Sequence, residues 1–116
     1  MWRLCKQLSI QGNRKKIGYG GIGYPVEGHS WQDAANWGYG SVMSSGEAVL
    51  ERYSSYADIL RSLAQNGCSA AIYTQTTDVE IEVNGLMTYD RKVMKVDEGK
   101  LAEINKAVIA AGTESR

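Results

Sequence analysis

The sequence has little proline, cysteine and histidine, and it has no phenylalanine. One proline and two cysteines occur among 116 residues, His29 is the single histidine, and the aromatic residues are seven tyrosines and three tryptophans. Two cysteines are too few for a disulfide framework, so cysteine usage leaves the cellular compartment undetermined. A single histidine excludes a site built from several imidazoles, and we expect neither a metal nor a cofactor.

The chain also lacks an excess of charge of either sign and a long apolar run. Lysine plus arginine number 13 and aspartate plus glutamate number 13, so the formal net charge is zero. A balanced charge gives no general reason to expect nucleic acid or an anionic membrane as a partner. No apolar run approaches the roughly 18 residues that a membrane span needs. The hydrophobic fraction of 43 % and the charged fraction of 22 % are typical of a globular chain.

Residues 45–65 have the clearest pattern and predict a helix. Ser44 and Glu47 fit the Ser-x-x-Glu capping box, in which each side chain binds an unpaired backbone N–H of the first turn. Asn66 and Gly67 follow the helix with residues that tolerate a left-handed backbone. Apolar residues recur at spacings of three and four and predict the buried face: Val49, Tyr53, Tyr56, Leu60 and Leu63.

The order of the remaining elements predicts an α/β fold. We expect strands at 17–22 and 69–77, and a second helix at 98–111 that Asp97 caps. Alternation of strands and helices is typical of βα units with a parallel sheet. Two strands and two helices do not close such a core. We therefore expect exposed strand edges, through which the chain could associate with itself.

Two clusters of polar and aromatic residues are candidates for chemistry. Glu27, His29, Trp31 and Trp37 lie in a glycine-rich loop, where indoles can stack on a sugar and polar groups can bind its hydroxyls. The alternative is that the tryptophans pin the loop to the body of the protein and His29 is a structural hydrogen bonder. Acidic residues follow the second strand, at the end where α/β enzymes place chemistry, or they are solvated surface: Asp78, Glu80 and Glu82.

Residues 19–31 and 71–91 resemble glycoside hydrolase family 2, which includes β-galactosidases, β-glucuronidases and β-mannosidases. The second stretch is the more specific, with YTQTTDVE at 73–80 followed by NGL and YDR. The resemblance implies a partial (β/α)8 barrel made of its last two βα units, from strand seven to helix eight. Residues 17–111 would form this quarter of the barrel, between a basic lead-in at 1–16 and a tail at 112–116.

The resemblance also implies what the chain lacks for catalysis. Retaining glycosidases need two carboxyl groups about 5–5.5 Å apart, an acid/base and a nucleophile. In this family the nucleophile is a glutamate whose position is occupied here by Gly18, and the Asn-Glu pair that carries the acid/base does not occur. The resulting hypothesis is a fragment of a retaining β-glycosidase that has no catalytic residue of its own and is inactive alone.

Four residues are expected to contact the carbohydrate substrate of the parent enzyme: His29, Trp31, Gln75 and Asp78. They combine an indole with hydrogen-bonding side chains, which is the mixture that a sugar pocket uses. The alternative hypothesis is a small carbohydrate-binding or interaction module that uses the loop rich in tryptophan and tyrosine.

Overall fold

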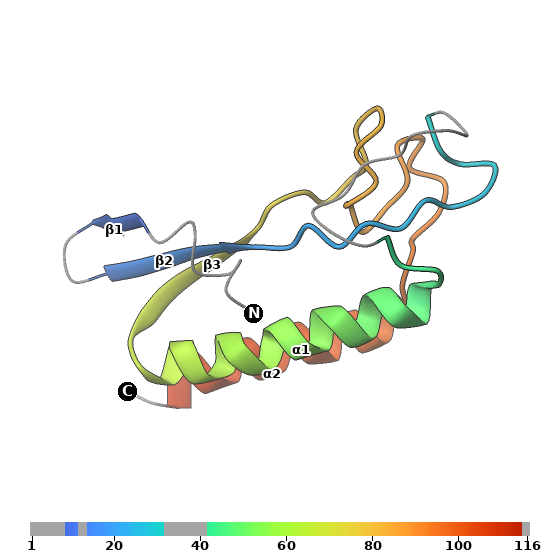
Figure 1. Ribbon diagram of the computed structural model, residues 1–116. Coiled ribbons are helices and arrows are strands. Elements are labelled where there is room, and N and C mark those ends of the chain that lie inside the picture. The colour runs from blue at the N-terminus through green and yellow to red at the C-terminus, as the bar shows by residue number, and fades with distance from the viewer. Residues whose placement is uncertain (1–8, 12–13, 32–41, 115–116) are drawn as a thin grey trace.

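A computed structural model of the chain describes residues 9–11, 14–31 and 42–114. The elements of this part of the chain are β1 (Ser9–Gln11), β2 (Arg14–Tyr19), α1 (Gly46–Gln65), β3 (Cys68–Tyr73) and α2 (Glu98–Glu114). The strands form one sheet in the order β1-β2-β3. Helices α1 and α2 lie side by side beneath the sheet (Figure 1).

The sheet is mixed, and this corrects the expected fold class. β2 and β3 are parallel, with Ile17 opposite Ala71, and α1 lies between them in the chain, as the alternation predicts. However, β1 runs antiparallel to β2, with Ser9 opposite Lys16. The prediction of the last two βα units of a (β/α)8 barrel is wrong, because such a barrel has parallel neighbours on both sides of a strand. Only two residues separate β1 from β2, which suffices for a hairpin but not for a parallel crossover.

Helix α1 confirms the predicted helix and moves its cap by one residue. The hydroxyl of Ser45, rather than Ser44, accepts a hydrogen bond of 3.1 Å from the backbone N–H of Ala48. Ser45 has an extended backbone, which is the conformation an N-cap adopts. The helix ends at Gln65, followed by its C-cap Asn66 and by Gly67, which has a φ of +95°. The buried residues of α1 are Val49, Tyr53, Ala57 and Leu60.

Helix α2 begins as predicted and ends later. The Asp97 carboxylate accepts a hydrogen bond of 3.0 Å from the backbone N–H of Lys100, which confirms the expected cap. The helix passes Gly112 and continues to Glu114. The Thr113 hydroxyl donates to the carbonyls of Ile109 and Ala110, so the last turn has its own polar contacts.

Both predicted strands end early, β3 at Tyr73 and β2 at Tyr19. β2 ends at Tyr19, where Gly20 and Gly21 follow with φ values of +127° and +76°. These left-handed conformations suit glycine and interrupt a strand. Ile22, beyond them, is buried against Val49, Tyr53 and Val96.

Neither helix of the described residues is long and apolar enough to cross a membrane.

Candidate functional site

The loops that follow β2 and β3 gather at one end of the molecule, away from β1 (Figure 1). Backbone hydrogen bonds tie them together. Tyr24 N–H donates to the Val83 carbonyl at 2.7 Å, and Lys95 N–H donates to the Leu86 carbonyl at 3.0 Å. The loop end is therefore a structured lobe, and it holds all four residues that the sequence assigns to sugar contact.

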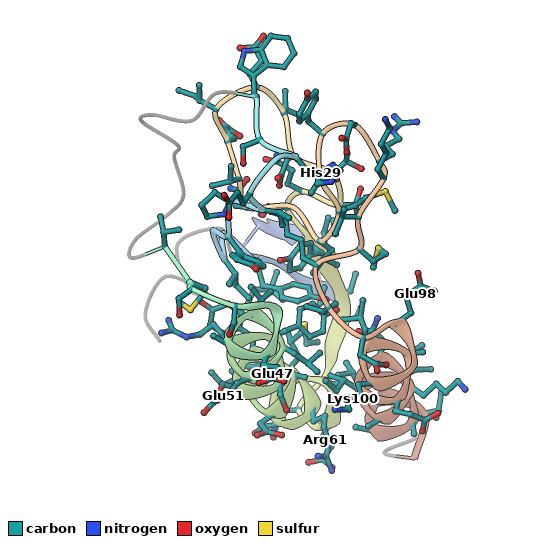
Figure 2. All side chains as sticks on the ribbon, turned by 90° about the vertical axis from the view of Figure 1, so that its right-hand side faces the viewer. His29, Glu47, Glu51, Arg61, Glu98 and Lys100 are labelled. Atoms are coloured by element: carbon teal, nitrogen blue, oxygen red, sulfur yellow. The ribbon has the colours of Figure 1, made fainter. Side chains whose placement is uncertain are left out.

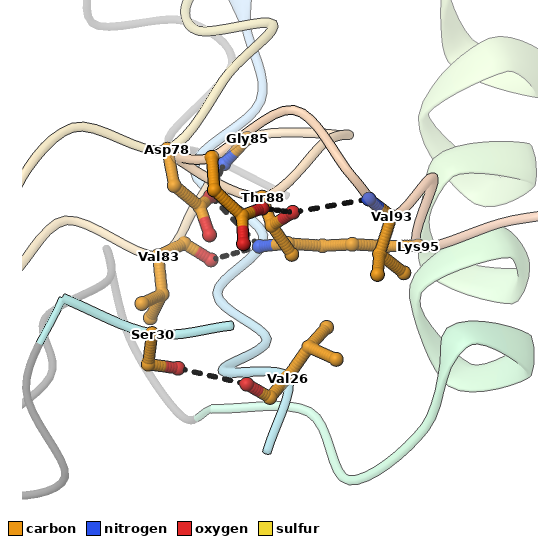
Figure 3. Close-up of polar contacts among 9 residues, drawn as sticks. Val26, Ser30, Asp78, Val83, Gly85, Thr88, Val93 and Lys95 are labelled. Carbon is orange, nitrogen blue, oxygen red and sulfur yellow. Dashed lines mark hydrogen bonds and ion pairs between the residues drawn. The ribbon is translucent and has the colours of Figure 1, made fainter. Parts of the chain in front are cut away.

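A buried ion pair lies inside this lobe. Lys95 Nζ is 2.8 Å from Asp78 Oδ1 and also donates to the Val83 carbonyl at 3.0 Å (Figure 3). The backbone N–H of Gly85 donates to the same Asp78 oxygen at 2.8 Å. Burial lowers the pKa of Lys95, and the Asp78 carboxylate opposes that shift. Asp78 thus joins three loop segments from beneath the surface, with its side chain 3 % exposed.

His29 and Asp90 form a second polar contact, nearer the surface. His29 Nδ1 is 2.8 Å from Asp90 Oδ2, while the Thr88 hydroxyl and the Lys92 N–H donate to Asp90 Oδ1. The hydrogen bonds from Thr88 and His29 hold the pKa of Asp90 well below its ordinary value of 3.8. Because an ionised carboxylate only accepts, Nδ1 of His29 is the donor. In the neutral form of the ring, this leaves Nε2 as an acceptor.

Trp31 and Tyr89, which lie within two residues of His29 and Asp90 in the sequence, form an exposed aromatic pair. Their ring centroids are 5.5 Å apart and the planes meet at 84°, so the edge of one ring meets the face of the other. Trp31 is 57 % exposed and Tyr89 38 %. Figure 2 shows His29 among the same loops, remote from the labelled helix side chains such as Glu51 and Arg61. We call His29, Trp31, Tyr89 and Asp90 the loop surface.

The structure places the four predicted sugar-contact residues in different surroundings. His29 and Trp31 belong to the loop surface, whereas Asp78 lies in the buried ion pair. Gln75 is half-buried, and its Nε2 atom has no hydrogen-bond partner among the described residues. Gly18, at the implied nucleophile position, lies within β2 opposite Ile72. The predicted Trp37 lies outside the described residues.

Sequence reasoning missed the partners of the predicted residues. Tyr89 and Asp90 lie in the stretch that carries the family resemblance, but nothing local shows that they meet Trp31 and His29. Nothing in the sequence marks Lys95 as buried, because a lysine in a loop is ordinarily solvated. Within the described residues, no group of three or more His, Cys, Asp or Glu side chains could hold a metal ion.

Comparison with family models and with curated proteins finds no match. The loop surface is therefore the part of the described structure that points to a function.

The lowered pKa of Asp90 predicts that the stability of the fold decreases in acid. Because its folded-state pKa is lowered, Asp90 stabilises the fold fully above the ordinary pKa of 3.8 and loses this contribution as the pH falls below it. We expect Asp90→Asn to be less stable than the unchanged protein at neutral pH, with the difference closing below about pH 4. Urea denaturation at a series of pH values measures this. A difference that stays constant down to about pH 2 would contradict the assignment.

Proposed function

We propose that this chain supplies a sugar-binding surface to a retaining β-glycosidase and does not itself break the glycosidic bond. The observation that carries the proposal is the exposed indole of Trp31, held edge-to-face by Tyr89 next to the His29–Asp90 contact. Both segments of this surface belong to the two stretches that resemble glycoside hydrolase family 2.

The chemistry of the loop surface suits a carbohydrate. An exposed indole can stack on the C–H face of a pyranose, which buries apolar area without a hydrogen-bond partner. Asp90 orients the His29 ring so that Nε2 can accept a hydrogen bond from a sugar hydroxyl. The Asp78–Lys95 pair contributes by joining the loops below, because its buried carboxylate is already occupied by Lys95 and Gly85.

Gly18 and the partners of two loop carboxylates, Asp78 and Asp90, support the second half of the proposal. A retaining mechanism needs two carboxyl groups about 5–5.5 Å apart, one of them a nucleophile. Gly18 has no side chain at the implied nucleophile position. Asp78 is bound by Lys95 and Asp90 by His29. Each of these carboxylates thus has a structural partner.

Binding of simple glycosides tests the proposal. Methyl β-galactoside, β-glucuronide and β-mannoside are titrated into the protein while tryptophan fluorescence and amide NMR shifts are recorded. We expect at least one to bind at the loop surface and Trp31→Ala to weaken binding about tenfold, equivalent to ~1.4 kcal/mol. Ile109→Ala, at a residue exposed on α2, is the control and should bind as the unchanged protein does.

Hydrolysis is assayed on the same preparation with nitrophenyl β-glycosides. Binding without turnover supports both halves of the proposal. Turnover by the pure protein would show that the chain is catalytic, whereas no binding of any of the three glycosides would refute the sugar-binding surface.

A further inference from the structure

The outer edge of β3, at Ala71 and Tyr73, is not covered by another strand of the described residues. Within the described residues, β3 pairs with β2 and with no other strand. Thr74 N–H donates to the Tyr19 carbonyl at 2.8 Å, so the backbone of Thr74 points toward β2. Because the backbone groups of a strand alternate between its two sides, those of Ala71 and Tyr73 point away from β2. These groups form a template for another strand.

The sequence of this edge lacks two of the devices that usually block such pairing. The sequence of β3, CSAAIY, contains neither a charge nor a proline. Ile72 is 61 % exposed. Beside the strand runs a groove of about 660 Å³ between β3 and the two helices. Its apolar lining includes Ala57, Leu60, Ala71, Val108 and Ile109.

We propose that two copies of this chain associate by pairing their β3 strands antiparallel, edge to edge. Apart from water, the partner that matches a row of backbone donors and acceptors is another extended backbone, whereas a small ligand in the groove leaves most of the row to water. A two-fold axis lets each β3 edge satisfy the other with the same residues. The three strands of one copy then continue into those of the other as one sheet.

The β3 edge can accept an identical copy without charge repulsion. Like charges on facing strands oppose pairing, and β3 has no charge to repel its counterpart. The formal net charge of the whole chain is zero, so two copies also meet without general repulsion. Side chains of the second β3 would cover part of the groove, which adds apolar burial to the backbone hydrogen bonds.

Sedimentation velocity over a range of protein concentrations tests the pairing. We expect a concentration-dependent dimer of the unchanged protein. Ala71→Pro removes an outward N–H and leaves the hydrogen bonds to β2 intact, so it should weaken the dimer at least tenfold. Ile72→Lys places a charge on each facing strand and should have the same effect.

Val79→Lys is the matched control, because Val79 is 57 % exposed and lies in a loop after β3. It should dimerise as the unchanged protein does. Circular dichroism establishes whether each variant keeps its helices, and if Ala71→Pro does not fold, Ile72→Lys decides. A monomer at every concentration would overturn the proposal. So would a dimer that survives Ile72→Lys, or one that Val79→Lys weakens equally.

Discussion

Replacement of Asp78 by alanine is expected to destabilise the fold by about 3–5 kcal/mol. The change leaves the Lys95 ammonium, whose side chain is 0 % exposed, without its carboxylate in the centre of the loop lobe. A buried charge without a partner is costly because the interior solvates it poorly. Gly85 N–H loses its acceptor as well. Urea denaturation followed by circular dichroism measures the loss in the free energy of unfolding.

Two further variants test whether the loss of stability comes from leaving a buried charge without its partner. Asp58→Ala removes one side of the exposed Asp58–Arg61 pair, whose atoms are 3.7 Å apart, and should change stability by less than about 1 kcal/mol. The double variant Asp78→Ala with Lys95→Met should recover much of the lost stability, because it removes both buried charges. If Asp78→Ala costs no more than Asp58→Ala, the ion pair does not hold the lobe together.

Tyr53→Ala is expected to cost about 3–5 kcal/mol of stability. Tyr53 is buried, and its ring centroid lies 6.0 Å from that of Tyr19 and 5.5 Å from that of Tyr73. Its hydroxyl donates to Asn105 Oδ1 at 2.6 Å, which connects α1 to α2. Removal of the ring leaves a cavity where the sheet meets both helices. Thermal and urea unfolding measure the effect.

Two comparison variants test how much of the effect comes from the Tyr53 ring and whether a surface tyrosine matters as much for stability. Tyr53→Phe keeps the ring and removes only the hydroxyl, so it should cost about 1 kcal/mol. Tyr89→Ala affects a half-exposed ring of the loop surface and should reduce sugar binding with little change in stability. A loss of stability as large in Tyr89→Ala as in Tyr53→Ala would contradict the division between core and surface.

The candidate site could be predicted only in part. The resemblance and the residue types point to His29 and Trp31, which lie on the loop surface. Their partners are out of reach of sequence reasoning, since His29 and Asp90 are 61 positions apart. Asp78 also looks like a surface acid in the sequence. Only the approach of Lys95 makes it a buried structural group.

The two helices follow from local patterns, and the alternation of strand and helix predicts the parallel pairing of β2 with β3. Asp97 caps α2 as predicted, the cap of α1 lies one residue after the predicted Ser44, and the stripe through Val49 and Leu60 repeats with the helical period. Such signals act over three or four residues and can be read directly from the chain. The antiparallel β1 cannot be read in this way, and neither can the contacts of the loop surface. They depend on hydrogen bonds and packing between distant segments, whose free energy appears only when the whole fold brings them together.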